Sequence, residues 1–356
     1  MNLLGFPLRT TLIAASLLIG QGEAMSAETA KSLSSPIVIA HRGASGERPE
    51  HTLAAYDLAI REGADVIEPD LVPTKDGHLV ARHENEISGT TDVASHPEFA
   101  DRKTTKTIDG QTETGWFTED FTLAELKTLR ARERLPQLRS TAYDGQFAIP
   151  TLEEIIALAK QRTKDTGRTI SIYPETKHPT YFASIGKGTD AALVAALTKA
   201  GWTTAEAPVF IQSFEVNNLK HLKTMTGIRL IQLVAGEDGP ADKAAPSYAA
   251  MMTPEGLKQV ATYAWGIGPD KAMLWNGDVP TTLVADAHAA GLRVHPWTYR
   301  AENYFVRPAF RKDTDPKAHG DVAGEIRAAL GQGIDGFFTD FPHIGVETRN
   351  AFLRAR

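Results

Sequence analysis

Short apolar runs alternate with amphipathic segments along the chain from residue 36 onward. An apolar run bounded by polar residues predicts a buried strand, and apolar residues spaced by three or four predict a helix with one buried face. We expect strands where such runs begin, near residues 36, 66, 169, 208, 229, 264, 293 and 336.

Helices are predicted between most of these strands. Their expected ranges are 52–61, 151–162, 190–200, 216–225, 254–263, 281–290 and 321–330. Thr52 and Thr151 are expected to cap the first two helices. Regular alternation of strand and helix indicates a parallel sheet, and eight units in a chain of 356 residues indicate a TIM (β/α)8 barrel. A doubly wound open sheet is the competing α/β fold, but its glycine-rich dinucleotide fingerprint is absent from the sequence.

The second predicted strand, 66–72, is expected to turn back at Asp76-Gly77, a strong signal for a two-residue hairpin loop. In that register Asp70 lies opposite His83. A slip of one residue would turn His83 to the other face of the ladder. The segment that follows, 84–150, lacks strand–helix alternation apart from one expected helix at 123–132. We interpret it as an insertion over one face of the barrel.

The N-terminus has the pattern of a secretory signal peptide. A basic residue precedes a short apolar run, Leu12–Ile19, and small residues follow, with cleavage expected after Ala24 or Ala27. The alternative is a plain N-terminal tail, or translation that starts at a later methionine. The expected domain boundaries are 1–27 for the signal peptide and 28–356 for a single barrel domain, with 84–150 as its insertion.

Composition narrows the classes of protein. A formal net charge of −6 gives no reason to expect nucleic acid as a partner. The chain has no cysteine, which excludes disulfides, thiolate metal sites and cysteine nucleophiles. After the signal peptide, no segment is long and apolar enough to predict a membrane span. The sequence does not indicate an oligomeric state.

Polar and aromatic residues gather at the carboxyl ends of the predicted strands. They are His41, Arg42, Glu68, Asp70, Glu175, Lys177, Phe214, His295, Trp297 and Asp340. In a TIM barrel these positions meet at one face, where active sites lie. Their convergence from separate segments is the strongest argument within the sequence for an enzyme. Phe214 and Trp297 could wall the pocket or, equally, belong to the core.

Glu68, Asp70 and Glu175 together would form an all-oxygen site. Carboxylates on one buried face repel one another unless a cation lies between them, and oxygen ligands favour Ca²⁺ or Mg²⁺ over zinc. The alternative is that the carboxylates form ion pairs with Arg42 and Lys177.

His41 and His83 are the candidate acid and base, because one histidine can take a proton while the other gives one. They could instead be ligands of a transition metal. Arg42 and Lys177 suit an anionic substrate such as a phosphate, although both could simply neutralise carboxylates.

Motifs at many separated positions share one pattern. The first group is Ala40-His41-Arg42-Gly43-Ala44, Pro49-Glu50-His51-Thr52, Glu68-Pro69-Asp70, Thr74-Lys75-Asp76-Gly77 and His83. The second group is Tyr173-Pro174-Glu175-Thr176-Lys177, Gln212-Ser213-Phe214, Gly266–Asp270, His295–Arg300 and Phe338–Pro342. The first group resembles the glycerophosphodiester phosphodiesterases, and the second resembles their longer, periplasmic branch. The likeness extends from about residue 36 to the C-terminus.

The resemblance implies a periplasmic TIM-barrel enzyme that hydrolyses glycerophosphodiesters, such as glycerophosphocholine and glycerophosphoethanolamine, to sn-glycerol 3-phosphate and an alcohol. The site residues that it implies are His41 and His83 for acid–base catalysis, Arg42, Lys177, Phe214 and Trp297 for the substrate, and Glu68, Asp70 and Glu175 for one divalent cation, Ca²⁺ rather than Mg²⁺. The chain departs from the family at Glu84, where Asp is common, and at Pro69, where Leu or Gln often stands.

Three questions stay open at this point. Either histidine could be the base, and the attacking group could be water or the 2-hydroxyl of the substrate. The enzyme could instead be a lipid-active phosphodiesterase of the same barrel group, similar to a lysophospholipase D. The chain could also be a non-catalytic periplasmic protein that binds glycerol phosphates, although such a protein would not need both histidines.

Overall fold

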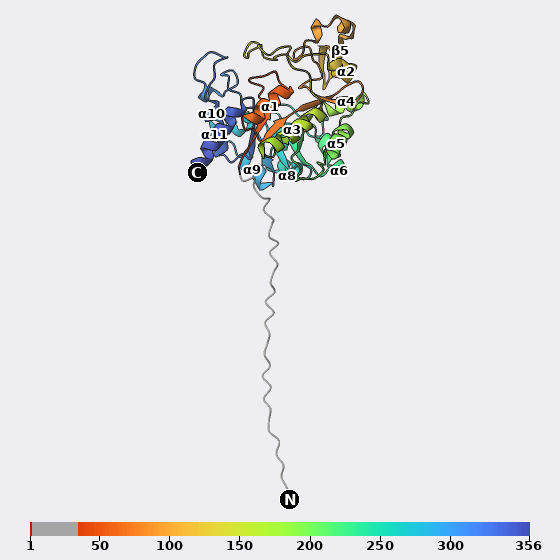
Figure 1. The fold of residues 1–356 in the computed structure, drawn as a ribbon. Helices are drawn as coiled ribbons and strands as arrows, with labels where there is room; N and C mark the ends of the chain where they lie inside the picture. Colours follow the sequence, from red (N-terminus) through yellow and green to blue (C-terminus); the bar gives the residue numbers. More distant parts are fainter. Residues whose placement is uncertain (2–34) are drawn as a thin grey trace. The chain divides into compact units, whose positions relative to one another are not determined.

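The computed structural model describes Met1 and residues 35–356. The predicted signal peptide, apart from Met1, lies outside the described residues, and it stays a prediction. The described strands and helices belong to one compact unit, Leu33–Arg356, in which helices surround the strands (Figure 1).

Two hydrogen-bonded sheets make up the barrel. Their strand orders are β15-β1-β2-β7 and β14-β11-β10-β9-β8-β3-β4. Neighbouring strands are parallel, except that β4 runs antiparallel to β3. The bounds are β1 Ile37–His41, β2 Val66–Glu68, β3 Asp70–Pro73, β4 Leu79–Ala81, β7 Ser171–Ile172, β8 Glu175–Thr176, β9 Phe210–Ser213, β10 Arg229–Val234, β11 Gly266–Pro269, β14 Arg293–Val294 and β15 Gly336–Thr339.

Two prolines lie at breaks between strands, and the first break divides the strand 66–72 that the sequence predicts as continuous. Pro69 separates β2 from β3, and Pro174 separates β7 from β8, because proline has no N–H to donate to a ladder. The remaining edges meet between β14 and β15, where Asp335 N donates a hydrogen bond to Val294 O at 3.0 Å. This bond continues the strand order around the TIM barrel that the sequence predicts.

Helices cover the outside of the barrel, and all seven expected helices begin within two residues of their predicted positions. They are α1 Leu53–Arg61, α3 Leu152–Thr166, α5 Asp190–Lys199, α6 Val216–Met225, α8 Pro254–Val260, α9 Leu283–Ala289 and α10 Val322–Gly331. Thr52 and Thr151 accept hydrogen bonds from Ala55 N and Glu154 N, which confirms both predicted caps. The pattern did not predict α4 Pro179–Ser184, α7 Tyr248–Met251 and α11 Pro342–Arg354.

The insertion is more ordered than the sequence indicates. Its elements are η1 Val93–Ser95, η2 Pro97–Arg102, β5 Thr104–Ile108, β6 Gln111–Gly115, η3 Thr118–Asp120 and α2 Leu123–Leu126. The predicted helix 123–132 is therefore wrong in extent. The missed β5–β6 hairpin turns at Asp109 and Gly110, with φ of 48° and 85°, as a two-residue turn with positive φ requires. A separate hydrophobic cluster, which includes Phe99, Trp116 and Phe121, packs the insertion onto Val72 and Val80 of the β3–β4 hairpin.

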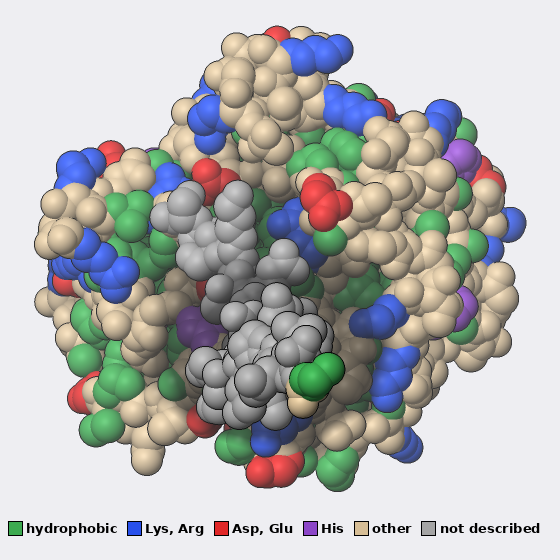
Figure 2. All heavy atoms as spheres, turned by 90° about the horizontal axis from the view of Figure 1, so that it is seen from below, with side chains coloured by type: hydrophobic (Ala, Val, Ile, Leu, Met, Phe, Trp, Pro, Cys, Tyr) green, Lys and Arg blue, Asp and Glu red, His purple; other side chains and the backbone are tan. Residues whose placement is uncertain are grey.

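The remaining short elements are η4 Lys271–Leu274, β12 Trp275–Asn276, β13 Val279–Pro280 and η5 Pro308–Phe310. None of the helices in the described part of the chain has the length and apolar character that crossing a membrane requires. Figure 2 shows one face of the molecule, on which basic and acidic side chains are interspersed wherever the surface is visible.

Candidate active site

The site lies one layer above the apolar filling of the barrel. That inner layer consists of Ile39, Val66, Tyr173, Phe210, Ile231 and Phe338. Side chains two residues apart on a strand project to the same side, so the position two residues further along points inward again, nearer the carboxyl end. At five strands the residue at that position lines a single cavity: His41, Glu68, Glu175, Gln212 and Leu233.

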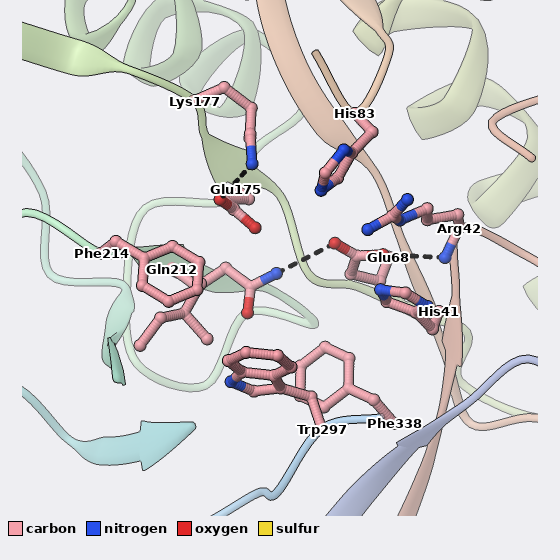
Figure 3. Close-up of a pocket in the computed structure, with 11 residues that line it drawn as sticks. His41, Arg42, Glu68, His83, Glu175, Lys177, Gln212, Phe214, Trp297 and Phe338 are labelled. Atoms are coloured by element: carbon pink, nitrogen blue, oxygen red, sulfur yellow. Dashed lines mark hydrogen bonds and ion pairs between the residues drawn. The ribbon is translucent and has the colours of Figure 1, made fainter. Parts of the chain in front are cut away.

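This cavity has a volume of about 130 Å³. Arg42, His83, Lys177, Phe214, Trp297 and Phe338 complete its lining. In Figure 3 the two histidines and Arg42 flank Glu68, whereas Phe214 and Trp297 lie on the opposite side of the cavity. The sequence predicts nine site residues, and the structure brings eight of them to the cavity wall. The ninth, Asp70, lies directly behind the wall and is only 1% exposed.

Glu68, Asp70 and Glu175 form a tight cluster of carboxylates. One oxygen of each lies within 4.8 Å of the other two, and all three residues are buried. Burial and the adjacent Asp70 raise the pKa of Glu68 well above its usual value. Burial raises the pKa of Glu175 to about 8, with Lys177 opposing the rise and Asp70 adding to it. Three carboxylates thus face two basic side chains, Arg42 and Lys177. Burial disfavours the charged form of Glu68 and Glu175, and a divalent cation would offset that cost.

Ion pairs are present in the cluster as well. Arg42 Nε lies 3.3 Å from Asp70 Oδ2, and Lys177 Nζ lies 3.2 Å from Glu175 Oε1. Although burial would raise the pKa of Asp70, a 2.9 Å hydrogen bond with His51 and the charge of Arg42 hold it well below its usual value. The predicted ion pairs are therefore present, and a cation site among the same carboxylates stays a prediction.

His41 is positioned by a carboxylate at its back. Its Nδ1 lies 2.6 Å from Asp340 Oδ1, so Nε2 is the ring nitrogen left for the cavity. Asp340 is in turn held by Arg139 Nη2 at 2.6 Å and Arg300 Nε at 3.0 Å. Burial and the nearby Arg42 lower the pKa of His41 to about 4, although Asp340 opposes this. The ring is thus neutral near pH 7 and able to accept a proton.

His83 reaches the cavity by a route that differs from the predicted one. The hairpin pairs Leu71 with Ala81 and Val72 with Val80, so Asp70 lies opposite Arg82, whose N–H donates to Asp70 O at 3.0 Å. The predicted register is therefore wrong by one residue. Its cause is a three-residue loop: Thr74 N donates to His78 O, which leaves residues 75–77 in the turn.

A bend after β4 nevertheless brings His83 into the cavity lining, because the ladder ends at Ala81. His83 Nδ1 lies 3.0 Å from Glu84 Oε1. Burial, Arg42 and Lys177 lower the pKa of His83 to about 3. Like His41, this histidine is neutral near pH 7. The cluster of closely spaced oxygen ligands includes neither histidine.

Arg42 sits at a strained backbone position, with φ of 61°. Its backbone N donates to Glu68 Oε2 at 2.8 Å, and its Nη1 donates to Glu50 Oε2 at 3.0 Å. The Glu50 contact and the ion pair with Asp70 hold the guanidinium beside the cavity, where a planar, always charged group suits a phosphoryl oxygen. The rings of Phe214 and Trp297 meet edge to face, with centroids 5.8 Å apart. They wall the cavity and are partly buried, each packed against the edge of a core cluster.

Sequence reasoning missed several residues of the site. Gln212 donates to Glu68 Oε1 at 3.1 Å, and the two-residue strand period could have revealed it. His51 is buried between Asp70 and the hydroxyl of Tyr56. Arg139 comes from the insertion, and no local signal marks it. Conversely, His295 is one of the strand-end residues that the sequence places near the site, but it lies in the barrel interior against Tyr173 and does not line this cavity.

The barrel, the carboxylate cluster, the paired neutral histidines and the adjacent cations together define an enzyme of the class that hydrolyses phosphoric diesters. The chain belongs to the glycerophosphoryl diester phosphodiesterase family, whose family model matches residues 41–344.

Relatives with this activity in their names cover most of the chain. A glycerophosphodiester phosphodiesterase of Arabidopsis thaliana is 40% identical over 86% of this chain and 84% of its own length. The enzyme of Haemophilus influenzae is 32% identical over 96% and 97%. Among solved structures, an Oleispira antarctica phosphodiesterase in complex with the product sn-glycerol-3-phosphate superposes with a TM-score of 0.60 at 23% identity, covering 89% of this chain and 97% of that one. At that identity the likeness shows the fold.

Proposed function

We propose that this enzyme hydrolyses glycerophosphodiesters such as glycerophosphocholine and glycerophosphoethanolamine to sn-glycerol 3-phosphate and the free alcohol. One observation carries the proposal: His41 and His83 line the same cavity as the carboxylate cluster and the two phosphate-binding candidates, Arg42 and Lys177. An acid, a base and a site for phosphoryl oxygens within one cavity are the groups that cleavage of a phosphodiester needs.

A divalent cation fits the donor set. Glu68, Asp70 and Glu175 would hold it, since they are buried, close together and without full charge compensation. When bound, the cation would polarise phosphoryl oxygens and offset the charge that develops on them. We propose Ca²⁺ rather than Mg²⁺, because Ca²⁺ accepts irregular sets of oxygen ligands whereas Mg²⁺ demands near-octahedral geometry.

The protein's own groups would perform the proton transfers. Arg42 and Lys177 bind phosphoryl oxygens and orient the diester. One histidine, neutral in the free enzyme, removes the proton from the attacking hydroxyl. The other takes up a proton when the negative phosphate binds beside it and raises its pKa, and it then donates this proton to the departing alkoxide. Asp340 holds the His41 ring by its Nδ1, so that Nε2 faces the substrate.

The test is release of sn-glycerol 3-phosphate from glycerophosphocholine by the purified chain, first with EDTA and then with Ca²⁺ or Mg²⁺ added back. We expect chelation to abolish release and Ca²⁺ to restore it best. His41→Gln and His83→Gln should each lower kcat by roughly 10²–10⁴-fold. The control is His221→Gln on the outer face of α6, where the histidine is 61% exposed. Wild-type rates in either cavity variant would refute the assignment.

A lipid substrate has less support. Among the described residues, the exposed large hydrophobic side chains are Met1, Leu53, Ile185, Val279 and Tyr304. None of them lines the cavity, so the described residues give it no rim of exposed large apolar side chains. The family of hydrolases to which the chain belongs also argues against a purely binding role.

We also propose export to the periplasm, on the strength of the basic, apolar and small-residue pattern within residues 1–27. Mass spectrometry of the chain recovered from a periplasmic extract would test it. A mature N-terminus just after Ala24 or Ala27 is expected, and an intact Met1 would overturn it.

A further inference from the structure

A second cavity lies next to the first. It has a volume of about 400 Å³ and shares Glu175, Lys177 and Phe214 with the catalytic cavity. We call it the outer chamber. The residues that matter for its chemistry are Asp109 at the turn of the β5–β6 hairpin, His178, Glu215, Asp238 and Tyr248. Because the two cavities have these three lining residues in common, they are adjacent, and a group attached to a phosphate in the first cavity lies beside the chamber.

Of the charged groups that line the chamber, Lys177 is paired with Glu175 and His178 with Asp109, and two carboxylates are left unmatched. Asp109 is neutralised, since its Oδ2 lies 2.6 Å from His178 Nδ1. Glu215 is only 3% exposed, and its oxygens accept hydrogen bonds from Thr180 N and Oγ1. Asp238 is exposed on the segment between β10 and α7. Among the described residues, neither Glu215 nor Asp238 forms an ion pair with a lysine, arginine or histidine.

A buried carboxylate without a counter-ion is unfavourable unless something compensates it. Burial, with Asp109 and Asp242 nearby, raises the pKa of Glu215. A cationic ligand in the chamber would supply the missing charge.

The aromatic lining points to the same ligand chemistry. Phe214 and Tyr248 meet at a ring-centroid distance of 6.2 Å with their planes 66° apart. Aromatic faces attract ammonium groups, and quaternary ammonium groups in particular, through the negative potential above the ring. A chamber with two aromatic rings and two unmatched carboxylates is therefore suited to an ammonium group rather than to a neutral or anionic one.

We propose that the outer chamber binds the ammonium head group of the departing alcohol, and that Glu215 and Asp238 make the enzyme prefer cationic glycerophosphodiesters to neutral ones. This inference rests on the proposed function, because it assumes that the phosphate lies in the catalytic cavity. The inference explains why the chamber beside a phosphate-binding cavity carries two unmatched carboxylates.

The test compares two substrates in the same enzyme. One is glycerophosphocholine, and the other is glycerophosphoglycerol, whose head group has no charge. The measured quantity is the ratio of kcat/KM for the first to that for the second. We expect Asp238→Asn to lower this ratio about two- to fivefold, as expected for an exposed charge pair. Glu215→Gln should lower it roughly tenfold, because its carboxylate is buried. Choline should inhibit turnover of glycerophosphoglycerol, and more weakly in both variants.

Glu237 provides a matched control. It is adjacent to Asp238, also exposed, and not part of the chamber lining, so Glu237→Gln should leave the ratio unchanged. Should Glu215→Gln fail to fold, Asp238→Asn still decides the question. An unchanged ratio in Asp238→Asn, with both substrates still cleaved, would overturn the head-group assignment and leave the proposed function standing. Absence of turnover of either diester by the wild type would overturn both.

Discussion

Replacement of Asp340 by Asn tests how the barrel positions His41. Asn has nearly the same shape but cannot supply the negative charge that faces His41 Nδ1 at 2.6 Å. A hydrogen bond to a charged group contributes about 1.5–3 kcal/mol. Since about 1.36 kcal/mol corresponds to a tenfold change in rate, loss of this contact predicts a fall in kcat of roughly 10- to 100-fold.

The substitution should act on kcat more than on KM. Asp340 is only 1% exposed and does not line the cavity, so substrate contacts stay in place while the ring loses its orientation. Arg139 retains Glu302 as a partner, with Nε 2.6 Å from Oε1, which limits the damage to the fold. The assay is steady-state kinetics on glycerophosphocholine, with circular dichroism to verify folding.

Asp335→Asn is the matched control. Asp335 also contacts a histidine and an arginine, with His288 at 2.8 Å and Arg293 at 3.1 Å, but it lies outside the cavity lining. A kcat for Asp340→Asn within threefold of the wild type, or an equal loss in Asp335→Asn, would refute the positioning argument.

Three further predictions concern the metal, the insertion and pH. Glu175→Gln should remove most of the rise in Tm that Ca²⁺ causes in the wild type. It should leave the metal-free protein at least as stable as the wild type, because it relieves repulsion between the carboxylates. An undiminished rise in Tm would exclude Glu175 as a ligand. Arg139→Met should cost about 3–5 kcal/mol in urea unfolding, since it strands the buried Glu302 and leaves Asp340 with Arg300 as its remaining arginine partner. A loss below about 1 kcal/mol would contradict this. Hydrogen bonds to Asp109 and Glu84 outweigh burial and raise the pKa of His178 to about 9, so its stabilising charge is fully present below about pH 6.5 and lost as pH rises through about 9. Urea unfolding of the chelated wild type and His178→Gln should differ by up to about 3 kcal/mol at pH 6 and converge by pH 10; a gap that does not depend on pH would rule this out.

The elements of the barrel could be predicted because they depend on local patterns. A strand buried on both faces needs a continuous apolar run, and a helix that packs on it needs an apolar stripe. Both patterns lie within a few residues of chain, and Thr52 and Thr151 even mark where helices begin. The site followed from the same rule, since parallel strands place their carboxyl ends together.

The hairpin register shows where local patterns stop being sufficient. The Asp76-Gly77 signal is compatible with a two- or a three-residue loop, and the difference shifts every pair in the ladder. His83 still reaches the cavity because the β4 ladder ends at Ala81 and the chain bends after it. The sequence therefore identified the residue although it predicted the wrong geometry.

What the sequence determines by itself is the order of strands and helices and the chemistry at the strand ends, because each follows from periodicity over short stretches. Only the tertiary structure decided that Asp340 supports His41 across 299 residues, and that Arg139 of the insertion joins Asp340 to Glu302. The outer chamber likewise brings together residues distant in the chain, because Asp109 and Asp238 both line it. The physical reason is that a buried charge finds its partner only when the barrel closes, and no pattern along the chain encodes which distant group then lies within hydrogen-bonding reach.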